Sequence, residues 1–366
     1  MTSPANETLV VTELHGRVGC ITLNRPRALN ALSLDMIRTI TQTLQTWRDD
    51  PMVLAVAVRG VSKEGPFGAF CAGGDIRFFH QAALAGDSAL GDFFTEEYAL
   101  NHLIHTYPKP YIAFMDGIVM GGGMGISQGA SLRIVTERSK LAMPETHIGL
   151  FPDVGGGYFL SRCAGRLGEY LALTGQVLNG KEAITAGLAD GYIDAGRLPG
   201  LWASFAQTPF ENGASVERWC ASHLSTAVLP ATWPAKEVDR VFSLPDVAQI
   251  IQALEATDSD WGRATAATLR QRSPLMLHVV LEQMRRARRM GLADDLRMER
   301  DMVHHCFHLR PGAAGETVEG IRALAIDKDH APQWNPARIE DVKREQAVAF
   351  FESPWPAEKH PLHALG

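Results

Sequence analysis

Two acidic side chains stand in apolar surroundings near the middle of the chain. Glu145 follows a Met-Pro pair, and Asp153 follows a Phe-Pro pair eight residues later. Burial there would raise the pKa of a carboxyl group and let two neighbouring carboxyls take different protonation states. Such a pair can activate water, attack a carbonyl carbon or donate a proton to a leaving group. The alternative is structural, with Glu145 starting a turn and Asp153 capping one.

A cluster of three glycines, residues 121–123, precedes the two acids. Acyl transfer needs hydrogen-bond donors aimed at the oxygen of a thioester, ester or amide. Backbone N–H groups at the start of a helix are unpaired and favour anions. The cluster follows a predicted buried strand and precedes a stretch, residues 124–131, for which we expect a helix. The alternative is a tight turn between strand and helix that binds no ligand.

A second glycine segment can supply another donor. In the sequence CAGGDI, residues 71–76, the N–H of Gly74 comes directly before Asp75. We expect Asp75 itself to be the N-cap of a helix over residues 76–81, which is a structural role. The residue types therefore predict an acyl-transfer site in which glycine amides hold an oxyanion and the two acids handle protons and water.

The elements that position these residues alternate between strands and helices up to residue 196. Strands are predicted by alternating or continuous apolar runs, and helices by apolar residues at helical spacing. The predicted strands are a hairpin over residues 8–24, then 53–59, 111–115, 132–136 and 140–143. The predicted helices are residues 34–49 with Ser33 as N-cap, 92–106, 160–173 and 181–187.

No strand pattern recurs after residue 196. Helices are predicted over residues 216–224, 246–255, 261–272, 275–290, 292–308 and 317–325, and the polar tail from residue 327 is expected to be loosely ordered except where it packs on the body. The chain is thus predicted to be an α/β protein with a core over residues 1–196 and an α-helical C-terminal region over residues 197–366.

Composition narrows the classes of function. An apolar content of 46% with 21% charged residues is typical of a globular protein, and a net charge of -6 gives no reason to expect nucleic acid or an anionic membrane as partner. No apolar run is long enough for a transmembrane helix. The N-terminal MTSPANETLV carries no signal-peptide pattern, and five scattered cysteines suggest reduced thiols, so we expect a cytoplasmic protein.

Three motifs together resemble the enoyl-CoA hydratase/isomerase (crotonase) family. They are CAGGDI at residues 71–76, GIVMGGGMG at 117–125 and MPETHIGLFPDVGGGYFL at 143–160. Two further segments, EEYALN at 96–101 and EGIRALAIDKDHAPQWNP at 319–336, resemble the branch of the family that hydrolyses 3-hydroxyisobutyryl-CoA in valine breakdown. The resemblance implies a crotonase-like spiral of ββα turns as the core.

The resemblance also implies roles for the residues singled out above. The N–H groups of Gly74 and Gly122 would hold the thioester oxygen, and Glu145 and Asp153 would be catalytic. Hydratases of this family carry a second glutamate where this chain has Gly125, which has no side chain to hold water for addition. One glutamate plus Asp153 suits hydrolysis better. Glu145 would attack the thioester or activate water, and Asp153 would position the group or shuttle the proton.

Further contacts with the substrate are implied. Glu97 would bind the substrate and is predicted to hydrogen-bond a hydroxyl group on it. Ala72 and Gly73 would lie along the coenzyme A arm, and residues 25–32 near its nucleotide. The expected partner is an acyl-CoA substrate, with no metal and no separate cofactor, because coenzyme A is part of that substrate. Homo-oligomers, as trimers or dimers of trimers, are common in the family.

Other readings compete with this one. The nearest is an enoyl-CoA hydratase or isomerase on the same fold, and one from another class is a CoA- or RNA-binding protein without turnover. The run GISQG around Ser127 matches a serine-hydrolase elbow, but a serine inside a helix does not suit that motif. His304 and His308 are one helical turn apart, and we expect exposed helix histidines there. The arginine-rich stretch 285–300 is expected to be a solvated helix face.

Overall fold

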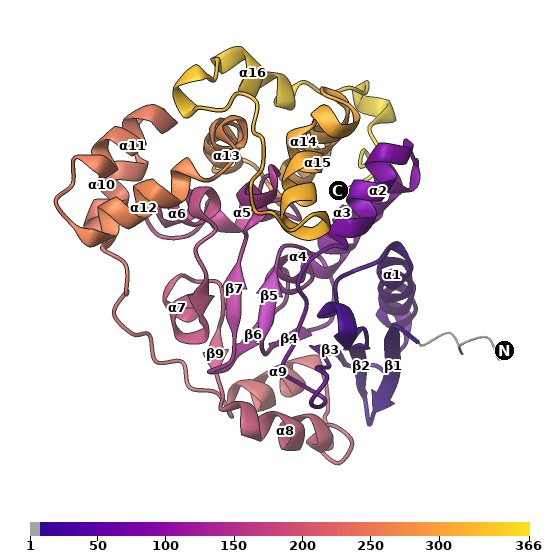
Figure 1. The fold of residues 1–366 in the computed structure, drawn as a ribbon. Coiled ribbons are helices and arrows are strands. Elements are labelled where there is room, and N and C mark those ends of the chain that lie inside the picture. The colour runs from indigo at the N-terminus through magenta and orange to yellow at the C-terminus, as the bar shows by residue number, and fades with distance from the viewer. Residues whose placement is uncertain (1–7) are drawn as a thin grey trace. The chain divides into compact units, whose positions relative to one another are not determined.

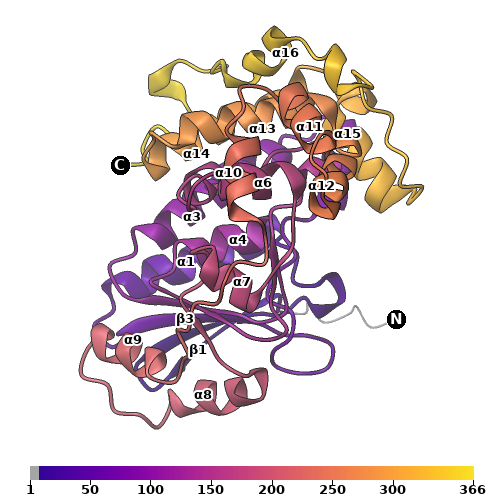
Figure 2. The ribbon, with the colours of Figure 1, turned by 90° about the vertical axis from the view of Figure 1, so that its left-hand side faces the viewer.

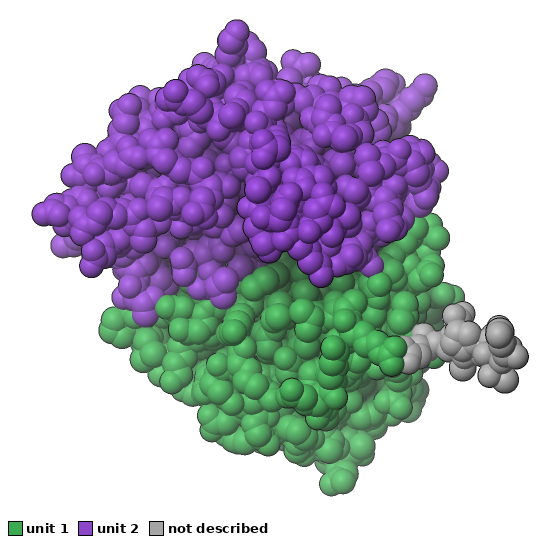
Figure 3. All heavy atoms as spheres, viewed as in Figure 1, with its two compact units in different colours: residues 1–74, 103–141, 178–230 green, residues 75–102, 142–177, 231–366 purple. Residues whose placement is uncertain are grey.

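The computed structural model describes residues 8–366. Residues 1–7, where the absence of a signal peptide is predicted, lie outside the described residues. The chain divides into two compact units (Figure 3): unit 1 comprises residues 1–74, 103–141 and 178–230, and unit 2 comprises residues 75–102, 142–177 and 231–366. The predicted boundary at residue 196 falls inside the last segment of unit 1 and stays a prediction.

Unit 1 is built on a six-stranded sheet. Its order is β1 (Val10–His15), β2 (Val18–Leu23), β3 (Ala55–Gly60), β4 (Tyr111–Met115), β6 (Leu132–Val135) and β9 (Gly191–Tyr192). The first pair is an antiparallel hairpin, as predicted, and the other neighbours are parallel. A smaller sheet contains β5 (Ile118–Met120), β7 (Lys140–Ala142) and β8 (Leu178–Asn179).

Helices cover both faces of the larger sheet of unit 1 (Figures 1 and 2). Val18 and Cys20 belong to a buried cluster that includes residues of α8 (Leu198–Ser204) and α9 (Gly213–Ala221). Gly19, between them in β2, points to the opposite face, where an added Cβ would lie 2.5 Å from the ring of Trp47 in α1 (Leu34–Asp49). The remaining helices of unit 1 are α4 (Gly122–Gln128) and α7 (Gly180–Thr185).

Unit 2 is almost entirely helical (Figure 1). It contains α2 (Ile76–Ala85), most of α3 (Ala89–His105), the 3-10 turn η2 (Glu145–Ile148), α5 (Gly156–Leu160), α6 (Leu167–Thr174), α10 (Ala235–Phe242), α11 (Val247–Glu255), α12 (Asp260–Arg270), α13 (Pro274–Ala287), α14 (Leu292–His308), α15 (Glu316–Ile321) and α16 (Arg344–Val348). α13 packs against α5, α6 and α16, while α14 packs against α5 and α15. These two long helices therefore both pack against α5, the short helix that follows the loop of Asp153.

Most predicted elements are confirmed, and the errors have physical causes. α1 and α14 have the predicted bounds, and Ser33 Oγ accepts the N–H of Met36 as the N-cap of α1. The single helix predicted over 160–173 is wrong, because Gly165 takes a left-handed φ of 58° and separates α5 from α6. α8 and α10 were not predicted, because Pro199 and Pro234 were interpreted as breaks, although proline is well tolerated at the start of a helix.

Two further expectations concern the whole chain. All five cysteines are buried and none forms a disulfide. Among residues 8–366, no helix combines the length and apolar character needed to cross a lipid bilayer. The cellular compartment stays a prediction.

Candidate active site

The two glycine segments of unit 1 lie backbone against backbone. The N–H of Met120 donates to the carbonyl of Cys71 at 3.0 Å. A Cβ on Gly123 would lie 2.3 Å from the same Cys71 oxygen, so only glycine fits there without a shift of the backbone. A Cβ on Gly73 would lie 3.6 Å from the nitrogen of Gly122. Residues 71–74 therefore run beside the start of α4, as an oxyanion site made from both segments requires.

The backbone N–H groups of Gly122 and Gly74 lie at positions where they can bind an oxyanion. Gly122 is the first residue of α4, where a backbone N–H has no partner within its own helix. The N–H of Leu32 donates to the carbonyl of Gly73 at 2.8 Å, a bond that does not use the amide of Gly74. The N–H of Ala72 donates to Leu29 at 3.0 Å, so this segment runs along residues 29–32, part of the predicted nucleotide region.

The three predicted acids all lie in unit 2 and are all buried. Glu97 is in α3, Glu145 is the first residue of η2, and Asp153 lies in the loop between η2 and α5; their exposed fractions are 2%, 6% and 5%. Buried carboxyl groups without a cation need hydrogen-bond donors. The Tyr98 hydroxyl donates to Asp153 Oδ2 at 2.9 Å, whereas one oxygen each of Glu97 and Glu145 has no partner among the described residues.

Burial raises the pKa of all three carboxyls. The negative charge of Asp153 adds to this effect at both glutamates. Burial raises the pKa of Asp153 to about 7, against the opposing effects of the Tyr98 hydroxyl and a backbone hydrogen bond. Tyr98 therefore favours the ionised form of Asp153, whose charge favours a proton on Glu145. The cluster holds both a charge and a proton near neutral pH, which is the condition for dividing acid and base roles.

The loop that carries Asp153 is held by a carboxylate from α14. Glu299 accepts the N–H of Gly155 at 2.7 Å through one oxygen and that of Gly157 at 3.0 Å through the other. These bonds hold Val154 at a φ of 57°, which is rare for a β-branched residue. Strain of this kind persists only where the surroundings fix it, and it is common at functional sites.

Two further side chains hold the same loop. Gln283 in α13 donates to the carbonyl of Pro152 at 2.6 Å, and Asp295 in α14 accepts the N–H of Tyr158 at 2.8 Å. A Cβ on Gly157 would lie 2.5 Å from Asp295 Oδ1, so the run of glycines lets α14 approach the loop. The loop is thus fixed on both sides of Asp153.

Glu145 is positioned by α15. Gly149 ends η2 with a φ of 65°, and a Cβ there would lie 2.4 Å from the carbonyl of Glu316. The hydroxyl of Thr317 donates to the carbonyl of Gly149 at 2.7 Å. The turn that begins with Glu145 is therefore held at its other end by the start of α15.

Several residues that hold this site were missed by the sequence analysis. Tyr98 and Gln283 were not considered, and the interpretation of residues 285–300 as a solvated face is wrong for three of its members. Asp295 and Glu299 have no exposed surface, and Arg300 is 6% exposed. A signal was present, because Asp295 and Glu299 continue the buried stripe of Met302 and Cys306 at helical spacing.

The competing motifs take structural roles. Ser127 lies inside α4, and its hydroxyl donates to the carbonyl of Gly123 at 2.8 Å, so it is not a nucleophile elbow. Asp75 accepts the N–H of Phe78 as the N-cap of α2, as predicted. The rings of His304 and His308 stack at 3.9 Å. Within residues 8–366 no group of three or more His, Cys, Asp or Glu residues could hold a metal ion.

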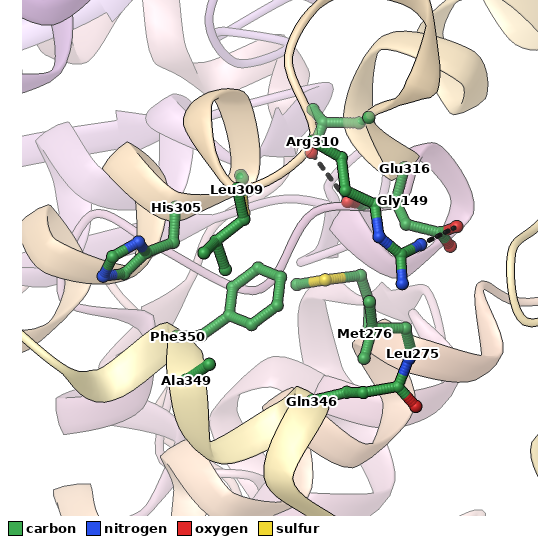
Figure 4. A pocket seen from close by; sticks show the side chains of 13 residues that line it. Gly149, Leu275, Met276, His305, Leu309, Arg310, Glu316, Gln346, Ala349 and Phe350 are labelled. Atoms are coloured by element: carbon green, nitrogen blue, oxygen red, sulfur yellow. Dashed lines mark hydrogen bonds and ion pairs between the residues drawn. The ribbon is translucent and has the colours of Figure 1, made fainter. Parts of the chain in front are cut away.

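A cavity of about 210 Å³ lies elsewhere in unit 2 (Figure 4). Its walls include Met276, Leu309 and Phe350, and an ion pair of Arg310 with Glu316 lies at its edge. None of the three predicted acids lines it. The predicted acids therefore lie outside this cavity, and their catalytic role stays a prediction.

The enoyl-CoA hydratase/isomerase family model matches residues 18–351. This chain belongs to that family. The fold is accordingly the crotonase α/β fold with a helical C-terminal region, and the chain is an acyl-CoA enzyme by family. Gly74, Ala72, Gly73 and Gly122 lie in unit 1 and the acids in unit 2, so their action on one thioester stays a prediction.

Named relatives and solved structures agree on the family but differ in the activity in their names. A mitochondrial 3-hydroxyisobutyryl-CoA hydrolase of Xenopus tropicalis is 40% identical, covering 92% of this chain and 87% of the relative. A probable 3-hydroxyisobutyryl-CoA hydrolase of Arabidopsis thaliana is 38% identical over 95% of this chain and 92% of its own length. A carnitinyl-CoA dehydratase structure from Mycobacterium thermoresistibile has a TM-score of 0.86 and 35% identity, covering 98% of this chain and 99% of its own.

Replacing Glu299 should destabilise the fold strongly. Glu299→Leu would leave the N–H groups of Gly155 and Gly157 buried without acceptors, at about 1–3 kcal/mol each. We expect the free energy of unfolding, measured in urea, to fall by about 2–6 kcal/mol. Asp294→Leu is the control, because this side chain on the same helix is 67% exposed; its effect should stay within about 1 kcal/mol. Equal effects of the two variants would contradict the proposed support of the loop.

Stability should fall as pH rises through the range in which Asp295 ionises. Burial raises its pKa to about 7, above the value of about 4 in an unfolded chain, so the folded state binds this proton more tightly. The resulting stability is fully present below about pH 4 and is lost as pH rises to about 7. In urea unfolding between about pH 5 and 8, Asp295→Asn should flatten this decline. An unchanged decline would show that Asp295 titrates normally.

Proposed function

We propose that the protein hydrolyses a short-chain 3-hydroxyacyl-CoA thioester, with 3-hydroxyisobutyryl-CoA of valine breakdown as the leading substrate. The observation that carries the proposal is the buried group of Glu97, Glu145 and Asp153 in a chain whose residue 125 is glycine. Hydration needs a second glutamate there to hold water, whereas hydrolysis needs one nucleophile or base and one group that moves a proton. The names of the hydrolase relatives support the same substrate.

In the proposed reaction the N–H groups of Gly74 and Gly122 bind the thioester oxygen as it becomes negatively charged. Glu145 acts on the carbonyl carbon, either by attacking it or by removing a proton from a water molecule that attacks. The bond between carbon and sulfur breaks, and Asp153 carries a proton to the leaving sulfur. Coenzyme A and the free hydroxy acid are released. With direct attack by Glu145, a water molecule then cleaves the resulting anhydride.

The two acids supply the proton that this division of labour needs. In the free protein that proton favours Glu145, so it passes to Asp153 before Glu145 attacks or activates water. A carboxylate is needed to attack or to activate water, and a carboxylic acid is needed to protonate the departing thiolate. Two exposed carboxyls would both be ionised at neutral pH, since their pKa values lie near 4. The raised pKa values of Glu145 and Asp153 keep one proton available without any other cofactor.

The remaining substrate contacts follow from the same proposal. Glu97 accepts a hydrogen bond from the substrate hydroxyl, and Ala72 and Gly73 line the path of the coenzyme A arm. No partner other than the acyl-CoA, whether nucleic acid or membrane, is proposed. A homo-oligomer, trimer or dimer of trimers, is proposed by family resemblance alone.

A second candidate is hydration of an enoyl-CoA. It is favoured by the names of two solved structures at 35% identity, the carnitinyl-CoA dehydratase and an enoyl-CoA hydratase of Rhodobacter sphaeroides with a TM-score of 0.83 that covers 95% of this chain and 98% of its own. The two reactions differ in one product. Hydrolysis releases a free thiol, and hydration releases none.

Thiol release from a panel of acyl-CoA thioesters tests the proposed function. The wild type should release coenzyme A from 3-hydroxyisobutyryl-CoA, and Glu145→Gln should lower kcat by about 10²–10⁴-fold, because the amide can neither attack nor accept a proton. Glu96→Gln, a neighbouring acid outside the buried group, should keep near wild-type activity. Loss of absorbance from an enoyl-CoA without any thiol release would favour hydration instead.

The pH dependence of hydrolysis should respond to Tyr98. Its hydroxyl stabilises the ionised form of Asp153, so Tyr98→Phe should raise the pKa of Asp153 above about 7. The limb of the pH–rate profile that reports Asp153 should move upward by about one pH unit, which corresponds to about 1.4 kcal/mol. Tyr107→Phe is the control, because that hydroxyl donates to the carbonyl of Leu44 instead. A profile that does not move in Tyr98→Phe would place the titrating group elsewhere.

A further inference from the structure

Two polar side chains interrupt the buried apolar stripe of α3. Leu90, Phe94 and Ile104 lie on one face of this helix at helical spacing, and Glu97 and Asn101 occupy the two positions between Phe94 and Ile104. Glu97 and Asn101 are one turn apart, so their side chains are neighbours on that face. Leucine at either position would continue the stripe at no cost in desolvation.

Both side chains are buried without being fully paired. Asn101 is 3% exposed, and neither its Nδ2 nor its Oδ1 has a hydrogen-bond partner among the described residues. One oxygen of Glu97 is in the same state. Each buried polar atom without a partner costs about 1–3 kcal/mol, and few such atoms occur in folded proteins. A side chain that carries this cost in an apolar stripe is expected to meet a polar group of a ligand.

The neighbours of Glu97 indicate which part of a ligand that is. Tyr98, the next residue in α3, donates its hydroxyl to Asp153 Oδ2 at 2.9 Å, and the charges of Glu97, Asp153 and Glu145 act on one another, so Glu97 lies near the acids to which the proposed function assigns the chemistry. A group bound at Glu97 therefore belongs to the acyl part of the substrate, close to the reacting carbonyl. The nucleotide of coenzyme A is too far along the substrate to be that group.

We propose that Asn101 is a specificity-determining residue that binds, together with Glu97, the hydroxyl of the 3-hydroxyacyl group. The inference rests on the proposed function and deepens it. A hydroxyl offers one hydrogen and two lone pairs. Glu97 accepts its hydrogen, and the side-chain N–H of Asn101 donates to its oxygen. An apolar acyl chain satisfies neither, so it leaves the polar atoms of both residues buried and unpaired.

Discrimination of this kind is strong, because a site built to hydrogen-bond a hydroxyl penalises an analogue that lacks it. The amide of Asn101 contributes only while the hydroxyl is present. Its removal should therefore lower activity on the hydroxylated substrate alone. If Asn101 had only a structural role, its removal would lower activity on both kinds of substrate. The ratio of kcat/KM values for the two substrates therefore distinguishes a binding role from a structural one.

The test compares 3-hydroxyisobutyryl-CoA with isobutyryl-CoA, which differ in a single hydroxyl. The ratio of their kcat/KM values should fall at least about tenfold in Asn101→Leu, while kcat/KM for isobutyryl-CoA stays the same or rises. Glu97→Gln should lower the same ratio, chiefly through KM for the hydroxylated thioester. An equal loss on both substrates, or an unchanged ratio in Asn101→Leu, would overturn the inference. Asn101→Ala serves as a second, smaller replacement should leucine prevent folding.

A binding measurement separates this inference from the proposed function. Calorimetry with the same two thioesters in Glu145→Gln, with and without Asn101→Leu, gives the affinity ratio without any turnover. If the wild type releases no thiol from any acyl-CoA, the proposed function fails, and this ratio still decides the role of Asn101. A ratio that Asn101→Leu leaves unchanged would overturn the inference.

Thermal unfolding of the unliganded protein adds an independent readout. Asn101→Leu removes two unpaired polar atoms from an apolar stripe, so it should raise Tm by a few degrees. If Asn101 binds substrate and destabilises the unliganded fold, Asn101→Leu should raise Tm and lower the selectivity ratio. A marked fall in Tm would show that protein groups already pair the amide, and would overturn the inference.

Discussion

The cost of burying carboxyl groups is the constraint on which unit 2 depends. Six of them are at most 6% exposed. Glu169 forms ion pairs with Arg166 and Arg288. The other five are Glu97, Glu145, Asp153, Asp295 and Glu299. Where donors to these groups are present, they are a tyrosine hydroxyl, a glutamine amide and backbone N–H groups. Donors without a full charge stabilise the ionised form less than a cation would, so burial wins and the pKa values rise. A cation beside Asp153 would hold it ionised and remove the proton that the proposed chemistry needs.

The loop after Asp153 shows how backbone and side chain share this task. Glu299 accepts two N–H groups of a glycine-rich turn, and these bonds hold Val154 in a left-handed conformation. Glycine at 157 lets Asp295 approach within contact distance of the backbone. The long motif around these residues is therefore not a set of independent site residues. Most of its residues shape the loop so that α14 can hold Asp153 in a fixed position.

The sequence predicted what is local and missed what depends on long-range packing. Helical spacing and a good N-cap located α1 and α14, and the apolar bracketing of Glu145 and Asp153 correctly indicated burial. The division into two units could not be predicted from the sequence, because each unit combines three segments that are far apart along the chain. The roles of Tyr98 and Glu299 were missed for the same reason, since they contact residues 55 and 142–144 positions away along the chain. The charges on α14 looked solvated because charge pattern alone cannot tell which face of a helix is covered.

Two helices of unit 2, α3 and α14, each carry a pair of polar residues one turn apart in a buried apolar stripe. The two pairs differ in how many of their polar atoms have a partner in the protein. In α14, Glu299 accepts two N–H groups from the loop of Asp153 and Asp295 Oδ2 accepts a third, while Asp295 Oδ1 has no partner among the described residues; the role of this pair is to position that loop. In α3, Asn101 has no partner for either polar atom, and Glu97 lacks one for an oxygen. The pair in α14 is thus structural, because three of its four oxygens accept backbone N–H groups, whereas the pair in α3 points to a ligand, because neither polar atom of Asn101 has a partner among the described residues. That difference cannot be read from spacing, because both pairs are separated by four residues, and it appears only when each buried polar atom is matched to a partner.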